Sequence, residues 1–189
     1  ASTRGGGFEI YRLNAETGND IKQLTYSDGN AYPSISGDNR WVAYDHQTEV
    51  GRSVWIVPIE GGDPVKVGDE YRMPVFSPDN QLIAARFERK SGTRDVAIFS
   101  VRGGAPLQRI PVPQIEWQRI YWLDNRTLSF IKNDGGISNI WSYDLGSGVS
   151  KQITDFNSDQ IFAYAWSPDF KQLVCQRGAK LTNVTIVGN

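Results

Sequence analysis

The sequence predicts an all-β fold built from repeated four-stranded antiparallel units. First, no segment of the 189 residues keeps a helical period beyond about two turns. Second, one strand motif recurs along the chain, in which a polar and a β-branched residue precede a variable, often aromatic one. Third, successive copies of this motif lie 42 to 44 residues apart. Several short strands in a repeat of this length are typical of one blade of a β-propeller.

The recurring motif marks the third strand of each unit, and we name the four strands A to D from inner to outer. Its five copies are 9–11, 53–55, 95–97, 139–141 and 183–185. Strands B and C are apolar on both faces, as in 54–57 and 96–99. A sheet with one face in water would alternate, so these runs predict a sheet packed between two neighbours.

The turn between strands A and B carries a Ser-Pro-Asp sequence at 77–79 and again at 167–169. Proline presets the backbone of a type I turn, and the serine hydroxyl can bond the turn backbone. The two copies are 90 residues apart, which is two repeats, and weaker turns at Asp38 and Asp124 mark the other repeats. Because an aspartate recurs at each of these turns, we interpret it as a local hydrogen-bond acceptor and not as a calcium ligand.

The repeats predict a flexible linker at 1–7 and a propeller at 8–189. Its expected parts are a partial blade at 8–25, blades at about 31–67, 72–110 and 118–153, and a partial last blade at 162–187. These make about four blade equivalents, and two arrangements fit them. The C-terminal strands A and B could pair with the N-terminal strands C and D in a closed ring of four blades, which leaves 183–187 unused. Alternatively, the chain is an open part of a larger ring, with strand edges that allow self-association. We favour the open arrangement because a closed ring of four blades would not use the predicted strand at 183–187.

Composition and charge exclude several classes of function. The formal net charge is −1, whereas a general nucleic-acid binder carries a basic excess. The charge is uneven, since residues 14–80 hold eleven acidic and five basic side chains and residues 86–119 hold three acidic and seven basic. No apolar stretch reaches 18 residues, so we expect no direct membrane insertion.

The chain offers few residues for chemistry. His46 is the only histidine and Cys175 the only cysteine, and this pair cannot build a typical zinc site. No Gly-x-Ser-x-Gly or phosphate-binding loop is present. We therefore expect no catalytic residues, no metal and no cofactor. Departures from the repeat are the better candidates for partner binding: His46 after strand B, and Trp117 with Arg119 in a proline-rich connector between blades.

The turn motif, the Ile-Tyr or Ile-Trp strand and the glycine turn after strand C together resemble the TolB-like β-propeller repeat over residues 8–187. Residues 36–38 depart from the motif by lacking proline, and 123–125 keep only a polar turn. The segment 159–166 looks like the last blade of propellers that end large bacterial regulatory proteins, which often carry a kinase or winged-helix domain. The resemblance implies a parent ring of six or more blades and a periplasmic or other extracytoplasmic location.

Three functions remain open at this point. The favoured one is a non-catalytic module for protein–protein interaction or ligand sensing, with a protein partner. A second is the propeller domain of a hydrolase or peptidase whose catalytic part lies elsewhere. A third is a structural module that oligomerises its parent protein.

Overall fold

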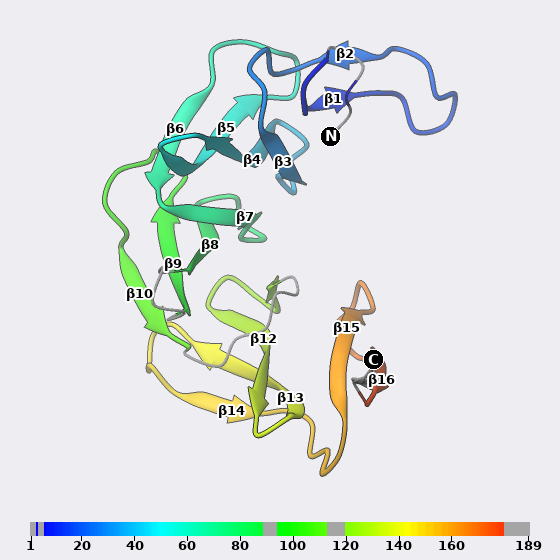
Figure 1. The fold of residues 1–189 in the computed structure, drawn as a ribbon, viewed down its shortest axis with the longest axis vertical. Helices are drawn as coiled ribbons and strands as arrows, with labels where there is room; N and C mark the ends of the chain where they lie inside the picture. Colours follow the sequence, from blue (N-terminus) through cyan, green and yellow to red (C-terminus); the bar gives the residue numbers. More distant parts are fainter. Residues whose placement is uncertain (1–2, 4–5, 89–93, 113–119, 180–189) are drawn as a thin grey trace, which may run out of the picture.

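A computed structural model describes residue 3 and residues 6–88, 94–112 and 120–179. Within these residues the chain forms sixteen strands and no helix. The strands make three four-stranded and two two-stranded antiparallel sheets, which follow one another along an open arc (Figure 1). None of the described segments forms a helix that is long and apolar enough to span a membrane. The prediction of an all-β, partial propeller with four-stranded blades is confirmed.

Every four-stranded sheet is assembled in chain order, so that each strand pairs with the next. The first sheet comprises β3 (Asn30–Ile35), β4 (Trp41–Thr48), β5 (Gly51–Pro58) and β6 (Val65–Asp69). The second comprises β7 (Tyr71–Phe76), β8 (Leu82–Glu88), β9 (Arg94–Ser100) and β10 (Gln108–Pro111). The third comprises β11 (Tyr121–Trp122), β12 (Thr127–Asp134), β13 (Ile137–Asp144) and β14 (Ser150–Gln152). We call these sheets the first, second and third blades. The first strand of each lies on the concave side of the arc and the fourth on the convex side (Figure 1).

The arc is open at both ends of the chain. The N-terminal pair is β1 (Tyr11–Arg12) with β2 (Lys22–Gln23), and the C-terminal pair is β15 (Gln160–Trp166) with β16 (Leu173–Gly178). These pairs form separate sheets and do not join into a closing blade, and they lie at opposite ends of the arc (Figure 1). The expected strand at 183–187 lies outside the described residues.

The hydrophobic core is divided into layers between neighbouring blades. The layer between the first and second blades contains Val54 and Ile56 from one side and Ile83, Ala85 and Phe99 from the other, with exposures of 4% or less. Because strands B and C contribute to layers on both of their faces, their sequences are continuously apolar. Within the described residues, each core cluster therefore lies where one sheet packs against the next.

The serines of the A–B turns form the hydrogen bonds that the turn motif predicts. The hydroxyl of Ser77 donates to Asp79 Oδ1 at 2.6 Å and accepts the backbone N–H of Leu82 at 2.9 Å. Ser36 and Ser167 each donate to the aspartate two residues later at the same distance. These aspartates thus act as local acceptors within the turn.

Asparagine side chains connect the A–B turns of adjacent blades. Asn80 Oδ1 accepts the backbone N–H of Gly37 in the preceding blade at 2.6 Å. Asn125 Oδ1 accepts the N–H of Asp79 in the same way at 3.0 Å. The A–B turns of the first, second and third blades are consequently bonded in series.

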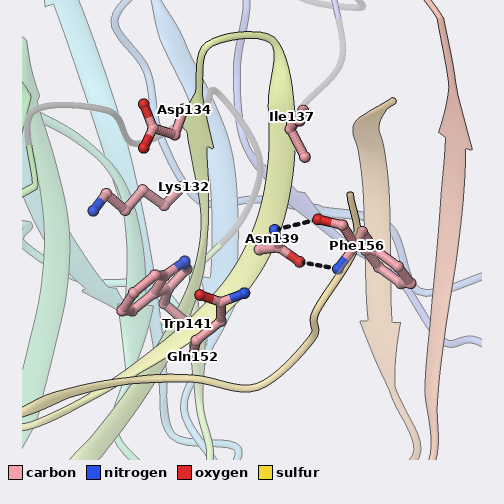
Figure 2. A pocket seen from close by; sticks show the side chains of 7 residues that line it. All are labelled: Lys132, Asp134, Ile137, Asn139, Trp141, Gln152 and Phe156. Atoms are coloured by element: carbon pink, nitrogen blue, oxygen red, sulfur yellow. Dashed lines mark hydrogen bonds between the residues drawn. The ribbon is translucent and has the colours of Figure 1, made fainter. Parts of the chain in front are cut away.

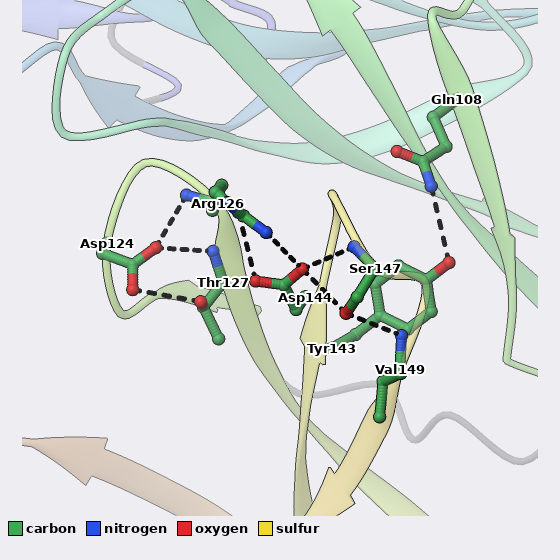
Figure 3. A network of polar contacts seen from close by, with 8 residues as sticks. All are labelled: Gln108, Asp124, Arg126, Thr127, Tyr143, Asp144, Ser147 and Val149. Atoms are coloured by element: carbon green, nitrogen blue, oxygen red, sulfur yellow. Dashed lines mark hydrogen bonds and ion pairs between the residues drawn. The ribbon is translucent and has the colours of Figure 1, made fainter.

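The third blade closes the same end of its sheet with an ionic network (Figure 3). Asp124 Oδ1 accepts the backbone N–H groups of Arg126 and Thr127, both at 2.7 Å. The Arg126 guanidinium binds both carboxylate oxygens of Asp144, at 2.9 and 3.2 Å. Ser147 donates to Asp144 through both its backbone N–H and its hydroxyl. The network joins the A–B turn to the C–D turn of one blade.

Because the strands are antiparallel, the D–A connections and the B–C hairpins lie at the other end of each sheet. The residue before strand A has a positive φ in three copies, namely 91° at Gly29, 69° at Glu70 and 63° at Asp159. At Gly29 a Cβ would lie 2.2 Å from the backbone oxygen of Gln47, so no larger residue fits there without movement. This close approach brings the start of β3 against the end of β4.

Candidate binding site

A row of four polar side chains crosses the first blade at its B–C end. Strand register places Asn30 opposite His46, His46 opposite Ser53, and Ser53 opposite Asp69. Residues that are directly opposite on neighbouring antiparallel strands point to the same face of the sheet. The row therefore runs over all four strands on one face, and we call it the His46 row.

The hydrogen bonds of Asn30 assign the proton of the His46 ring. Asn30 Nδ2 donates to Glu9 Oε2 at 3.0 Å and to the backbone oxygen of Ser27. The amide oxygen Oδ1 is thereby directed at His46 Nδ1, 3.0 Å away. Since an amide oxygen only accepts, the neutral ring carries its proton on Nδ1 and leaves Nε2 as an acceptor.

Burial holds this arrangement in place. Glu9, Thr25 and Asn30 are all buried, with exposures of 5%, 2% and 1%. Glu9 Oε2 also accepts the hydroxyl of Thr25 at 2.6 Å, and Thr25 Oγ1 in turn accepts the N–H of Ile10 at 3.0 Å. A buried polar network with satisfied partners is rigid, because any reorientation would leave a buried group unpaired. His46 is thus oriented from behind by a chain of fixed groups.

The other ring nitrogen of His46 is available to a ligand. Nε2 has no hydrogen-bond partner anywhere in the described part of the chain. His46, Trp55 and Asp69 line a surface hollow of about 920 Å³, together with Ser53, Lys66 and Glu70. A volume of this size is within the range of ligand-binding clefts.

Trp55 and Lys66 form the outer part of the hollow. Trp55 is half-buried, and its indole Nε1 donates to Ser53 Oγ at 2.8 Å. The Lys66 ammonium lies 5.9 Å from the centroid of the Trp55 ring and 2.7 Å from Asp69 Oδ1. A cation within about 6 Å of an indole face is attracted by the ring. The hollow therefore contains an aromatic platform, a carboxylate and a cation from the chain itself.

The row does not have the geometry of a serine nucleophile. A catalytic Ser–His pair requires the hydroxyl to donate to the imidazole. Among the described residues, His46 instead bonds Asn30, and Ser53 accepts a hydrogen bond from Trp55. The arrangement is suited to recognition, since it displays fixed donors and acceptors around a hollow.

The third blade shows what stands at the equivalent positions (Figure 2). Lys132 lies opposite Asn139 as His46 lies opposite Ser53, and Trp141 corresponds to Trp55. The Lys132 ammonium is 4.7 Å from the Trp141 centroid, and Asn139 is held by two hydrogen bonds to the backbone of Phe156, at 2.7 and 3.0 Å. The hollow here is smaller, about 240 Å³. In this blade a lysine of the chain covers the tryptophan from the position that His46 has in the first blade.

Asp45 lies on the opposite face of the same sheet, between the first and second blades. Its side chain is 1% exposed, with Oδ2 at 3.5 Å from Arg52 Nη1 and 3.9 Å from Arg72 Nε. Oδ1 has no hydrogen-bond partner within the described residues. Burial raises the pKa of Asp45 to about 6, against the opposing influence of the charges on Arg72 and Arg52. Both ion-pair distances exceed those of a strong charged hydrogen bond, which explains why desolvation dominates.

Of the three residues that the sequence singled out, the structure places His46 in this site. Trp117 and Arg119 lie in 113–119, outside the described residues, and remain predictions. Sequence reasoning missed Asn30, Trp55 and Asp69 as parts of the site, because their proximity depends on strand register. Within the described ranges, no group of three or more His, Cys, Asp or Glu side chains could hold a metal ion.

Comparisons with known proteins agree with this architecture. No family model matches the sequence, and no curated protein matches it. Among solved structures, TolB from Acinetobacter baumannii superposes with a TM-score of 0.70 at 18% identity, over 93% of this chain and 44% of that one. Acylaminoacyl peptidase from Pyrococcus horikoshii gives 0.61 at 14% identity, over 86% of this chain and 31% of that one. A nidogen–laminin complex gives 0.61 at 14% identity, over 89% and 66%.

These likenesses define the class of the protein by its fold. The chain has the fold of part of a β-propeller of the TolB-like kind. It spans less than half of the TolB chain and about a third of the peptidase chain. At identities below 20%, the agreement concerns the fold and does not extend to what those proteins bind or catalyse.

Proposed function

We propose that this chain is a non-catalytic binding module that engages a protein partner through the hollow beside the His46 row. The observation that carries the proposal is a partly exposed histidine whose Nδ1 is bonded to buried Asn30 and whose Nε2 has no hydrogen-bond partner among the described residues. Rigidly held polar groups beside an aromatic platform are typical of recognition sites.

Two features of the fold support a role in protein recognition. The hollow lies at the end of the blade that carries the B–C hairpin, and loops at the ends of a rigid scaffold commonly carry binding functions. One of the similar structures is a nidogen–laminin complex, so a propeller of this shape occurs in a protein assembly. The family resemblance adds an extracytoplasmic location to the proposal, which fractionation of cells expressing the natural gene would test.

Quantitative capture from an extract of the source cells tests the proposal. Wild-type chain, Trp55→Ala and Lys171→Ala would be immobilised in equal amounts. Lys171 lies at the opposite end of a sheet with its side chain 82% exposed, so its replacement serves as a matched surface control. We expect a protein that is retained by wild type and by Lys171→Ala and lost with Trp55→Ala. Equal retention by all three, or no specific retention, would contradict the proposal.

A second candidate function is favoured by the likeness to acylaminoacyl peptidase, in which the matched region is 31% of a longer enzyme chain. The present chain would then be the propeller of a larger hydrolase. Sequencing the natural gene on both sides of this segment tests the idea, since a serine-hydrolase domain in the same reading frame is the expected finding. A reading frame without such a domain would eliminate this candidate.

Self-association is a third candidate, favoured by the unpaired strand edges. Among the described strands, β1 pairs only with β2 and β16 only with β15. Exposed edges can pair with another chain. Light scattering with size-exclusion chromatography would reveal a concentration-dependent oligomer if the edges associate, and a strict monomer would argue against this role.

A further inference from the structure

We propose that the hollow of the first blade binds a cationic N–H donor, an arginine side chain of a peptide partner. In this assignment His46 Nε2 accepts a hydrogen bond from the guanidinium, Trp55 stacks against its plane, and Asp69 provides the counter-charge. The inference rests on the proposed function and specifies the chemistry of the partner.

The locked histidine determines the polarity of the ligand group. With the proton of the neutral ring on Nδ1, held by Asn30 Oδ1 at 3.0 Å, Nε2 can only accept. A carboxylate or a carbonyl, which also only accept, would find no donor at this atom. The ligand group that meets His46 must therefore donate an N–H or O–H.

The charges around the hollow favour a donor that is also positive. Asp69 and Glu70 are both exposed at its rim, next to the D–A connection. The cations nearby are Arg52, whose guanidinium faces Asp45 at 3.5 Å, and Lys66, which is paired with Asp69. Residues 14–80, which contain the whole blade, hold eleven acidic and five basic side chains. Such a surface attracts a basic partner.

Lys66 shows that the hollow accepts a cation. Its ammonium occupies the space between the Trp55 ring and Asp69, at 5.9 and 2.7 Å. The side chains of Lys66 and Asp69 are 46% and 65% exposed, and ion pairs at this exposure are weak and easily exchanged. In the third blade a lysine also lies over the tryptophan, although Lys132 comes from strand B and the residue equivalent to Lys66 is Gln152. We interpret Lys66 as an internal occupant that a partner's guanidinium displaces, because a planar guanidinium stacks on an indole and donates in several directions at once.

The first measurement uses the wild-type chain and its single histidine. In a protein labelled with ¹⁵N-histidine, long-range ¹H–¹⁵N spectra of the neutral ring should show Nδ1 protonated and Nε2 bare. The probe Nα-acetyl-arginine amide is then titrated in, with its neutral isostere Nα-acetyl-citrulline amide as the control ligand. We expect saturable shifts of Nε2 with the arginine probe and at least about threefold weaker binding of the citrulline probe, since one charged contact is lost.

Two variants and a matched control test the assignment of the subsite. Lys66→Gln removes the internal occupant, so the arginine probe should bind about twofold to fivefold more tightly, as expected for loss of an exposed competing ion pair. Trp55→Ala removes the platform and should weaken binding at least about threefold. Lys171→Gln, in the A–B turn of the C-terminal pair, should bind the arginine probe as wild type does. If Trp55→Ala were misfolded, the Lys66→Gln result and the wild-type titration would still decide the question.

The outcomes separate this inference from the proposed function. A bare Nδ1 in the wild-type spectrum, equal affinity for the two probes, or unchanged affinity in Lys66→Gln would overturn the inference. If a partner protein is captured in a Trp55-dependent manner and the arginine probe does not compete, the binding module stands and its ligand is not an arginine. If the probe binds as expected and no partner is captured, the arginine site stands and the proposed partner role fails.

Discussion

The amide oxygen of Asn30 lies 3.0 Å from Nδ1 of His46, across two adjacent strands of the first blade. This one contact sets the chemical character of the site, because it decides which ring nitrogen faces the hollow without a proton. Asn30 can perform this task because its own amide group is held by Glu9 and by the backbone of Ser27. The site is therefore prepared from the buried side of the sheet.

Replacing Asn30 should change the tautomer of His46, which lies on the neighbouring strand. In Asn30→Ala, Nδ1 loses its acceptor and the neutral ring should populate both tautomers, which ¹⁵N spectra of His46 report. The same change removes one donor from buried Glu9, so we expect a loss of unfolding free energy of about 1 to 3 kcal/mol. Wild type, in which Asn30 Oδ1 remains the acceptor for Nδ1, is the reference for the tautomer. An unaltered ¹⁵N spectrum of the His46 ring in Asn30→Ala would show that another group fixes the tautomer.

Asp45 should make stability depend on pH in a characteristic direction. Its pKa in the folded protein is about 6, above the value of about 3.9 for an unfolded chain. Between these values the folded state holds more protons than the unfolded state, so the free energy of unfolding should fall as the pH rises. The contribution lost by neutral pH is about 2 to 3 kcal/mol, at about 1.4 kcal/mol per unit. Urea denaturation of wild type and Asp45→Asn between about pH 4 and 7 measures it, and we expect the difference between the two curves to grow with pH. A difference in unfolding free energy between wild type and Asp45→Asn that does not change with pH would refute the raised pKa of Asp45.

The buried turn serine should matter more than its exposed copy. Ser77 is 1% exposed and bonds both Asp79 and the N–H of Leu82. Ser77→Ala leaves this part-buried N–H without its partner and should cost about 1 to 2 kcal/mol of unfolding free energy. Ser167 makes equivalent bonds to Asp169 and Gln172 in a more exposed turn, so water can replace them. Chemical denaturation should therefore show a clearly smaller loss for Ser167→Ala, and equal losses would contradict the role of burial.

The glycine before β3 should tolerate no side chain. Gly29 has φ 91°, and an added Cβ would lie 2.2 Å from the oxygen of Gln47. Gly29→Ala should cost at least about 2 kcal/mol, because backbone strain is added to a steric clash. Gly135, with φ 57° and no heavy atom within 4 Å of an added Cβ, is the control. Gly135→Ala should cost about 1 kcal/mol, so thermal or chemical unfolding separates the two variants.

The Asp144 carboxylate should titrate at unusually low pH. Its pKa lies well below the ordinary value, first because Arg126 donates to it and second because of the N–H and hydroxyl of Ser147 (Figure 3). A depressed carboxyl pKa stabilises the fold above the unfolded value of about 3.9, and this stabilisation is lost as the pH falls below it. Carboxyl ¹³C titration of Arg126→Gln should show the pKa of Asp144 raised toward its ordinary value. The stability difference between wild type and variant should shrink in acid.

The architecture was predictable from the sequence because each blade repeats the same short sequence features. The third-strand motif, the Ser-x-Asp turns and the doubly apolar strands each follow from backbone chemistry within a few residues. The open arrangement also agrees with expectation, since β1–β2 and β15–β16 do not pair. Local sequence thus carried most of the information about the fold.

The site was only partly predictable. His46 attracted notice as the sole histidine and as a departure from the repeat, since the equivalent residues are Phe87 and Lys132. Its partner Asn30 precedes it by 16 residues, and Glu9 belongs to the preceding unit. Their convergence depends on register between strands and on packing between units, which no short motif encodes. Asp69 and Trp55 were missed for the same reason.

The asparagine contacts between A–B turns have a consequence for how such a protein can change in length. Asn80 reaches back to Gly37, and Asn125 reaches back to Asp79, so the second and third blades each carry the asparagine that bonds them to the blade before. A duplicated or deleted stretch of 42 to 44 residues would insert or remove a complete blade together with the asparagine that bonds it to its neighbour. Gene duplication can therefore lengthen or shorten the array by whole blades, whereas a change of one or two residues in an A–B turn would remove this bond between neighbours that still share a core layer.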